Sequence, residues 1–199
     1  MGQYYKAYVE PLDKPPIVLD AWSYENGAKL MEHSWLGNEF VNAVISRIEK
    51  RPARVAWVGD YSDDTDNNDL KCDRKVFDTC WGENSTTSKV TIFDKSLFCV
   101  ESEEPFDGIE IVGTGYFVNH TKSQYIDLKQ YAQEARCSHG WVVNPLPLLT
   151  AVGNGLGGGD YRGINTSMVG YWYLDKLEFT RDSAPKNYAN VTDDCIFRE

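Results

Sequence analysis

The sequence predicts an α+β domain with a mainly antiparallel β-sheet, one dominant packed helix over about residues 38–50, and long irregular loops. Short apolar segments separated by turn residues recur along the chain, as they do in sheet proteins. Residues 38–50 show the clearest helical spacing of apolar residues. Strands and helices do not alternate in a βαβ rhythm, so a parallel sheet covered by helices on both faces is not expected.

The elements can be placed along the chain from apolar spacing, caps and prolines. Asn38 is the expected N-cap of the main helix, and Pro52 lies just past its end. Residues 141–152 are expected to be extended, because a residue before proline avoids the α region. In chain order, the expected elements are strands at 3–9 and 17–24, the helix at 38–50, a strand at 54–61, hairpins at 89–100 and 116–128, a short helix at 128–135, the extended segment at 141–152 and aromatic strands at 168–180.

The chain length predicts a single domain. A chain of 199 residues can bury one substantial core, and lengths of roughly 100–200 residues are typical of one domain. We expect residues 1–181 to form this globular domain. Residues 62–88 are polar and irregular, which predicts a loop insertion with one short helical turn near 76–80. Residues 182–199 are expected to form a loose polar C-terminal tail.

The net charge of −10 limits the classes of partner. Nucleic-acid binding needs a basic surface that releases counterions, so no nucleic-acid partner is expected. A basic protein would be attracted instead, although charge of this size also serves solubility alone. No apolar run approaches the roughly 18 residues that cross a bilayer, so no membrane insertion is expected. The N-terminal segment does not read as a secretory signal, which predicts a cytoplasmic or intracellular protein, free or within a particle.

The glycine-rich segment Leu148–Gly163 contains six glycines and a formal G-x-G-x-x-G. A dinucleotide fingerprint needs its third glycine to open a helix, and GGDYRGINTS continues with turn residues instead. We therefore expect no nucleotide cofactor. Two readings stay open: a backbone that needs glycine to bend or pack closely, and a loop that presents Asp160 and Arg162 to a ligand.

Metal-like motifs are incomplete, and no metal or other cofactor is predicted. DTDNNDL resembles the start of a calcium loop, but Asp69 replaces the required glycine and Lys75 stands where a glutamate belongs. Cys137 and His139 lack a second pair at zinc spacing. The five cysteines are odd in number and irregular in spacing, which favours buried or half-buried free thiols over a disulfide framework.

Polar side chains near the ends of the expected elements supply the candidate site. His33 and Asp60 are the candidate catalytic acid and base, since both titrate and stand beside regular elements. A buried structural histidine is the alternative for His33, and turn formation is the alternative for His120. The candidate ligand-binding residues are Glu32, Trp35, Asn38, His120, Lys122, Asp160 and Arg162.

Five segments occur in a characteristic order: KLMEHSWLGNEFV, VAWVGDY, YFVNHTKSQYIDL, PLPLLTAVGNGLGGGDYRG and MVGYWYLDKLEF. Through the motifs EHSWxGN, GDY, VNHTK and PLPLLTAxGNGxGGGDYxG, the chain resembles a family of small uncharacterised soluble proteins of bacteria and viruses. The resemblance covers about half of the chain between Gln3 and Phe179, and residues 62–88 and the tail depart from it. Leu156 stands where family members often carry arginine, so an anion contact there is not implied. The resemblance implies a grouping of polar segments but no activity.

Two hypotheses of function follow. The leading one is a non-enzymatic protein-interaction module, either a component of a larger assembly or a binder of the inhibitor or immunity type. It is favoured by the acidity, the many aromatic residues expected to be exposed, the long loops and the absence of a complete catalytic motif such as G-x-S-x-G. The alternative is a small enzyme or small-molecule binder, whose polar cleft would be formed by the EHSW, GDY, NHTK and GGGDYRG segments together.

Overall fold

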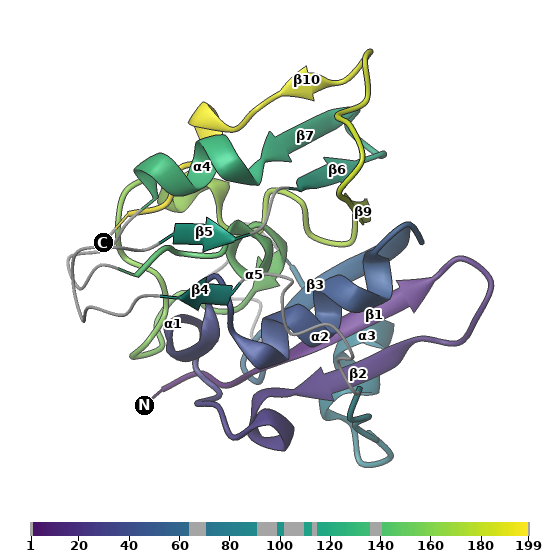
Figure 1. Ribbon diagram of the computed structural model, residues 1–199. Coiled ribbons are helices and arrows are strands. Elements are labelled where there is room, and N and C mark those ends of the chain that lie inside the picture. The colour runs from purple at the N-terminus through teal and green to yellow at the C-terminus, as the bar shows by residue number, and fades with distance from the viewer. Residues whose placement is uncertain are drawn as a thin grey trace.

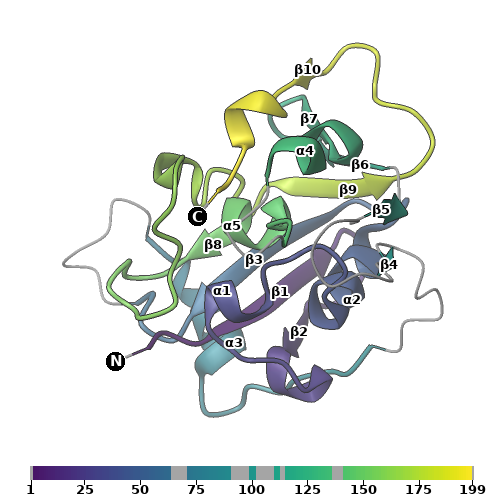
Figure 2. The same ribbon diagram turned by 60° about the vertical axis from the view of Figure 1, so that its left-hand side comes forward.

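A computed structural model of the protein describes residues 2–63, 71–90, 99–101, 110–112, 115–135 and 141–198. Its centre is an eight-stranded, mostly antiparallel sheet in the order β10-β7-β6-β9-β3-β1-β2, with β8 paired to β3, and Figure 2 shows this order from top to bottom. Five helices pack around it within the described ranges (Figure 1). The predicted α+β class is therefore confirmed.

The bounds of the elements are as follows. The strands are β1 Tyr5–Pro11, β2 Ile17–Asp20, β3 Ala53–Gly59, β4 Cys99–Glu101, β5 Glu110–Val112, β6 Tyr116–Asn119, β7 Gln124–Asp127, β8 Ala151–Val152, β9 Lys176–Thr180 and β10 Ala189–Asn190. The helices are α1 Leu30–His33, α2 Glu39–Ile48, α3 Arg74–Trp81, α4 Leu128–Glu134 and α5 Pro145–Thr150, and short 3₁₀ turns lie at Ala21–Tyr24, Thr166–Met168 and Asp193–Cys195. Strands β4 and β5 pair with each other in a separate small sheet.

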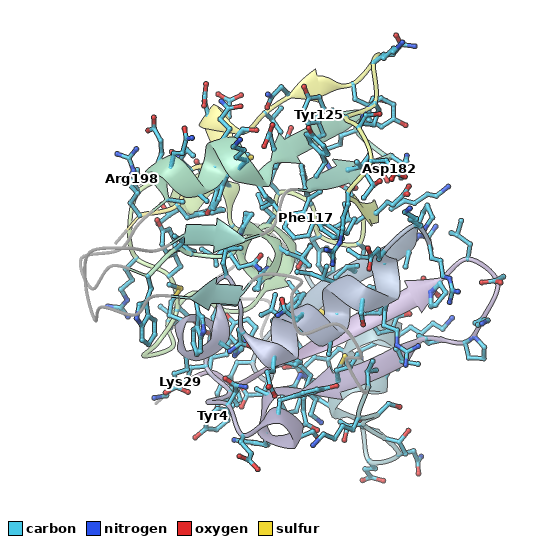
Figure 3. The ribbon with its side chains drawn as sticks, viewed as in Figure 1. Tyr4, Lys29, Phe117, Tyr125, Asp182 and Arg198 are labelled. Carbon is cyan, nitrogen blue, oxygen red and sulfur yellow. The ribbon has the colours of Figure 1, made fainter. Side chains whose placement is uncertain are left out.

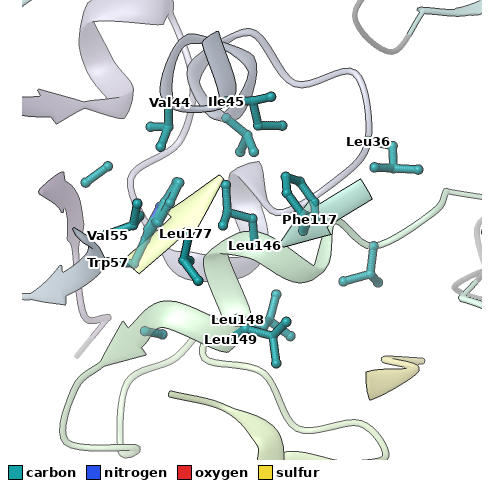
Figure 4. Close-up of a cluster of buried hydrophobic side chains, with 14 of the residues drawn as sticks. Leu36, Val44, Ile45, Val55, Trp57, Phe117, Leu146, Leu148, Leu149 and Leu177 are labelled. Carbon is teal, nitrogen blue, oxygen red and sulfur yellow. The ribbon is translucent and has the colours of Figure 1, made fainter. Parts of the chain in front are cut away.

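Strand β3 has buried side chains on both of its faces because side chains alternate along a strand. Val55 and Trp57 join the core under α2, whereas Ala56 and Val58 pack with Val76 of α3. Figure 4 shows Trp57 and Val55 beside Val44 and Ile45 of α2 and Leu146 of α5. Helices α2 and α3 therefore cover opposite faces of the sheet, and each fully buried aliphatic side chain stabilises the fold by about 1.5–3 kcal/mol.

The main helix begins and ends close to the predicted bounds. The Oδ1 atom of Asn38 accepts a hydrogen bond from the Val41 backbone N–H at 3.2 Å, which is the expected N-cap contact. The apolar stripe of α2 is fully buried against the sheet. The predicted hairpin over 116–128 also forms as β6 and β7, and the short helix after it forms as α4.

Three local predictions were wrong. The segment 141–152 contains helix α5, because Pro145 occupies its first turn, where no N–H is needed, and the Asn144 side chain caps it. Strand β2 ends at Asp20, whose carboxylate accepts from Ser23 N–H at 2.8 Å and starts a 3₁₀ turn. The insertion carries a complete eight-residue helix, α3, where a single turn was expected.

One further segment differs from its prediction, and another lies partly outside the described residues. The aromatic segment 168–180 forms β9 only from residue 176, after a series of turns. Residues 91–98 of the predicted 89–100 hairpin lie outside the described residues, so this hairpin stays a prediction. Strand β4, at the end of that range, pairs with β5.

The C-terminal segment is packed, contrary to the expected loose tail. Residues 189–190 form β10 beside β7, and Cys195 and Phe197 are fully buried. The Phe197 ring meets the Tyr161 ring edge-on, with 5.2 Å between the ring centroids. The Tyr161 hydroxyl donates to the Ile164 carbonyl and accepts from the Arg198 N–H. Polar composition misled the prediction because a few apolar residues at the end of the segment anchor it.

Because Phe197 fills part of the core, we predict that Phe197→Ala lowers the free energy of unfolding by about 3–5 kcal/mol. Urea unfolding followed by circular dichroism measures the loss. Leu12→Ala is the matched control, since Leu12 is 63% exposed and its truncation should change stability by less than about 0.5 kcal/mol. Equal effects of the two substitutions would show that the C-terminal segment is not part of the core.

No helix in the ranges that the structure covers is both long and apolar enough to cross a membrane.

Candidate functional site

The glycine-rich segment packs against the N-terminal end of β1. Gln3 is completely buried, and glycines at positions 59, 153 and 157 surround its side chain. A Cβ atom at these positions would approach Gln3 atoms to 2.3, 2.4 and 2.6 Å, respectively, distances that real side chains do not adopt. Close packing against Gln3 therefore explains why glycine is needed at positions 153 and 157. At Gly155 and Gly159, a positive φ explains it.

Asp160 fastens this glycine loop to the sheet. Its Oδ1 accepts from the Tyr5 hydroxyl at 2.9 Å, and its Oδ2 accepts from the Gly157 backbone N–H at 2.7 Å. Burial raises the pKa of Asp160, while these hydrogen bonds and the charge of Arg162 lower it by less. Arg162 itself is exposed. Asp160 thus has a structural role, and part of its side chain still faces solvent.

Asp60 lies within electrostatic range of Asp160, because Asp160 is hydrogen-bonded to Tyr5, and Tyr5 pairs with Gly59, the residue before Asp60. The Asp60 carboxylate accepts from the Tyr4 N–H at 3.0 Å, and the Asp60 N–H donates to the Tyr4 carbonyl at 2.9 Å. Burial raises the pKa of Asp60, and the charge of Asp160 raises it further. The two carboxylates therefore repel each other.

His33 is a structural histidine in this fold. It is fully buried, and Trp57 Nε1–H donates to its Nε2 at 3.0 Å. Nε2 is therefore the acceptor, so Nδ1 carries the proton and donates to the Gly27 carbonyl at 3.0 Å. Burial lowers the pKa of His33 to about 4. Both ring nitrogens are occupied away from solvent, so the geometry gives His33 no access to a substrate.

The other residues of the EHSW segment also act locally. Asn38 caps α2 and donates through Nδ2 to Asn26 at 2.7 Å. Glu32 pairs with Lys29 at 2.9 Å on the surface. The Trp35 ring packs on the Trp141 ring at 5.1 Å. Element ends attract such residues for capping and pairing, which is why their sequence pattern resembled a site.

The NHTK segment lies at the other end of β3. The His120 N–H donates to the Lys176 carbonyl, and Lys176 of β9 lies opposite Arg54 of β3 in the sheet. Arg54 and Asp60 are six residues apart along an extended strand, which is roughly 20 Å. The four polar segments therefore do not form the single cleft that the alternative hypothesis required.

At that end, His120 and Lys122 close the β6–β7 turn onto β9. His120 Nε2 lies 2.8 Å from Glu178 Oε2, and its Nδ1 lies 3.1 Å from the Tyr188 hydroxyl. Lys122 Nζ pairs with Asp175, which also accepts from Asn119 at 2.8 Å. These polar side chains satisfy one another, as the turn alternative for His120 predicted.

Exposed aromatic side chains beside Asp60 were missed by the sequence reasoning. The Tyr4 and Trp22 rings lie 5.5 Å apart and are 40% and 58% exposed. Tyr61, which follows Asp60, is 38% exposed. Figure 3 shows Tyr4 and Lys29 together at the N-terminal end of the molecule. An aromatic residue in a predicted strand can lie on either face of the sheet, so only the tertiary structure shows that these three rings are exposed at the surface.

Metal binding receives no support from the described ranges, which contain no group of three potential metal ligands. The calcium-like residues 64–70 and the pair Cys137 and His139 lie outside the described residues. Cys72, Cys80 and Cys195 are free thiols that are buried or half-buried, as expected.

No protein-family model, no curated protein and no solved structure matches the chain. Inference about function therefore depends on the geometry of this chain.

If Gln3 fills the space beside Gly157, an added methyl group there must displace the Gln3 backbone. We predict that Gly157→Ala lowers the free energy of unfolding by about 1–3 kcal/mol. The adjacent Gly158→Ala is the control, since its Cβ would meet nothing within 4 Å, and the change should be neutral or stabilising by up to about 1 kcal/mol. Chemical denaturation of both variants tests the packing, and equal stabilities would contradict it.

The buried His33 predicts a pH dependence of stability. Its folded pKa of about 4 lies below the ordinary value of 6.5, so the unfolded state binds more protons between these values. Stability should therefore fall as the pH decreases from about 6.5 to about 4, by an amount on the order of 3 kcal/mol. His33→Gln removes the titration and should flatten the curve over this range. A His33 pKa near 6.5 by NMR titration would contradict the assignment.

Proposed function

We propose that the protein is a non-enzymatic interaction module that binds a basic protein partner through one surface. We call this surface the aromatic–acidic face and define it by Tyr4, Trp22, Asp60, Tyr61 and Asp160. The observation that carries the proposal is the contact between two exposed aromatic rings, Tyr4 and Trp22, on backbone that is hydrogen-bonded to Asp60 at Tyr4, with the charge of Asp160 acting on Asp60. The partner's contact residues would include lysine or arginine.

The aromatic rings support a protein contact because exposed tryptophan and tyrosine supply most of the binding energy in many interfaces. Trp22 lies in the 3₁₀ turn capped by Asp20. Both the backbone N–H and the carbonyl of Tyr4 are hydrogen-bonded to Asp60. Both rings are therefore presented on fixed backbone. A preorganised surface loses little conformational entropy when a partner binds.

The carboxylates support a cationic partner. Burial raises the pKa of both Asp60 and Asp160, and the charge of Asp160 raises the pKa of Asp60 further. A lysine or arginine of the partner that pairs with these carboxylates would offset that cost. Cations also pack favourably on exposed rings such as Tyr4 and Trp22. The net charge of −10 would also speed the approach of a basic protein.

We also propose that the chain belongs to the family of small bacterial and viral proteins that its motifs resemble. It would suit either an assembly component or an inhibitor of a basic enzyme. The inward position of His33 and the separation of NHTK from Asp60 favour this function over a catalyst built from the predicted polar residues.

The test is capture from an extract of the source organism by the immobilised protein, with bound proteins identified by mass spectrometry. We expect a basic protein to be retained at low salt and released as the salt concentration rises. Trp22→Ala and Tyr4→Ala should each reduce retention by about tenfold or more, the typical effect of removing an interface aromatic. Asp60→Asn should weaken retention mainly at low salt.

Tyr171→Ala is the matched control, since Tyr171 is 39% exposed, like Tyr4, but lies beside Lys122 at the other end of the sheet. This control should retain the partner. The proposal fails if nothing is captured at low salt, or if capture is the same for the face variants and the control.

A further inference from the structure

A cleft of about 340 Å³ opens beside the first turn of α3, on the sheet face opposite α2. This volume lies within the range of small-ligand sites. Its lining comes from five separate parts of the chain and includes the buried Tyr8. Its lining includes Glu10, Arg54, Asp73, Lys75, Thr121 and Leu174.

The carboxylates of the cleft are already occupied. Glu10 pairs with Arg54 at 3.4 Å and lies beside the Tyr8 hydroxyl, whose pKa is raised by burial and then by the Glu10 charge. Asp73 accepts from the Val76 N–H at 3.2 Å and caps α3. Both carboxylates therefore already have a partner within the fold.

The cations of the cleft have unused binding capacity. Arg54 has one long contact with Glu10, although a guanidinium carries five N–H donors. Lys75 is exposed, and no described residue forms an ion pair with it. Thr121 Oγ1 accepts from the Lys176 N–H at 2.9 Å, which leaves its hydroxyl proton available to a ligand. Donors therefore converge on the cleft in a chain whose net charge is strongly negative.

The backbone of the wall is held in a costly conformation. Leu174 has φ of +55°, in the left-handed region, which is unfavourable for a non-glycine residue. The hydrogen bond from the Leu174 N–H to the Val55 carbonyl, at 3.0 Å, fixes this residue against β3. Strain of this kind gathers at ligand-binding sites, and here Leu174 supplies an apolar part of the lining.

From these contacts we infer that the cleft binds the oxyanion of a small molecule, a carboxylate or a phosphate. Arg54 and Lys75 supply the charge, Thr121 donates a hydrogen bond, and Leu174 contacts the apolar part of the ligand. This site is separate from the aromatic–acidic face, since Arg54 and Asp60 lie near opposite ends of β3. Its ligand would be a small metabolite and not the basic protein.

The test titrates the whole protein with inorganic phosphate and, separately, with acetate at constant ionic strength, followed by backbone amide NMR. We expect saturable shifts of amides near Arg54, Lys75, Thr121 and Leu174 with at least one anion. The anion that saturates identifies the ligand as a phosphate or a carboxylate.

The double variant Arg54→Gln/Lys75→Gln should weaken this binding by about tenfold or more, the effect of losing charged hydrogen-bond donors. Lys129→Gln/Lys186→Gln removes the same number of positive charges from outside the cleft lining and should bind normally. Linear, non-saturating shifts with both anions, shifts confined to other regions, or equal weakening in the control would each overturn the inference. The NMR map in the unmodified protein decides the matter even if the cleft variant does not fold.

Discussion

The close approach of the glycine loop to the start of β1 is the constraint on which this edge of the molecule depends. Gln3 fills space that side chains at 59, 153 and 157 would otherwise occupy, and Asp160 ties the loop to Tyr5. Successive residues of a strand point to opposite sides, so burying Gln3 and Tyr5 turns Tyr4 outward. The exposed ring in the proposed interface is thus a consequence of packing under the loop.

The two proposed surfaces differ in charge because they lie near opposite ends of β3. At its carboxyl end, Asp60 is hydrogen-bonded to the Tyr4 backbone and feels the charge of Asp160. Near its other end, Arg54 faces a cleft with Lys75. A protein of net charge −10 can in this way combine a surface that attracts a basic protein with a small pocket that attracts an anion, because the sheet keeps the two apart.

Several residues singled out as a site turn out to be structural, and the reason is shared. Asn38, His33 and His120 stand where helices and strands end, and chain ends leave backbone or side-chain polar groups that need partners. Asn38 caps α2, His33 joins Trp57 to Gly27, and His120 joins the β6–β7 turn to β9. A polar residue beside a regular element indicates capping at least as strongly as chemistry.

The sequence by itself determined the α+β class, helix α2 with its Asn38 cap, the β6–β7 hairpin and helix α4, because these depend on contacts within a few residues. It also excluded a nucleotide fingerprint in the glycine loop. Only the tertiary structure decided that His33 is inaccessible, that residues 189–198 are packed, and that Tyr4 and Trp22 share a surface. Those outcomes depend on contacts between distant segments, such as Gln3 with residue 153 and Tyr161 with Phe197, which no local pattern of residues records.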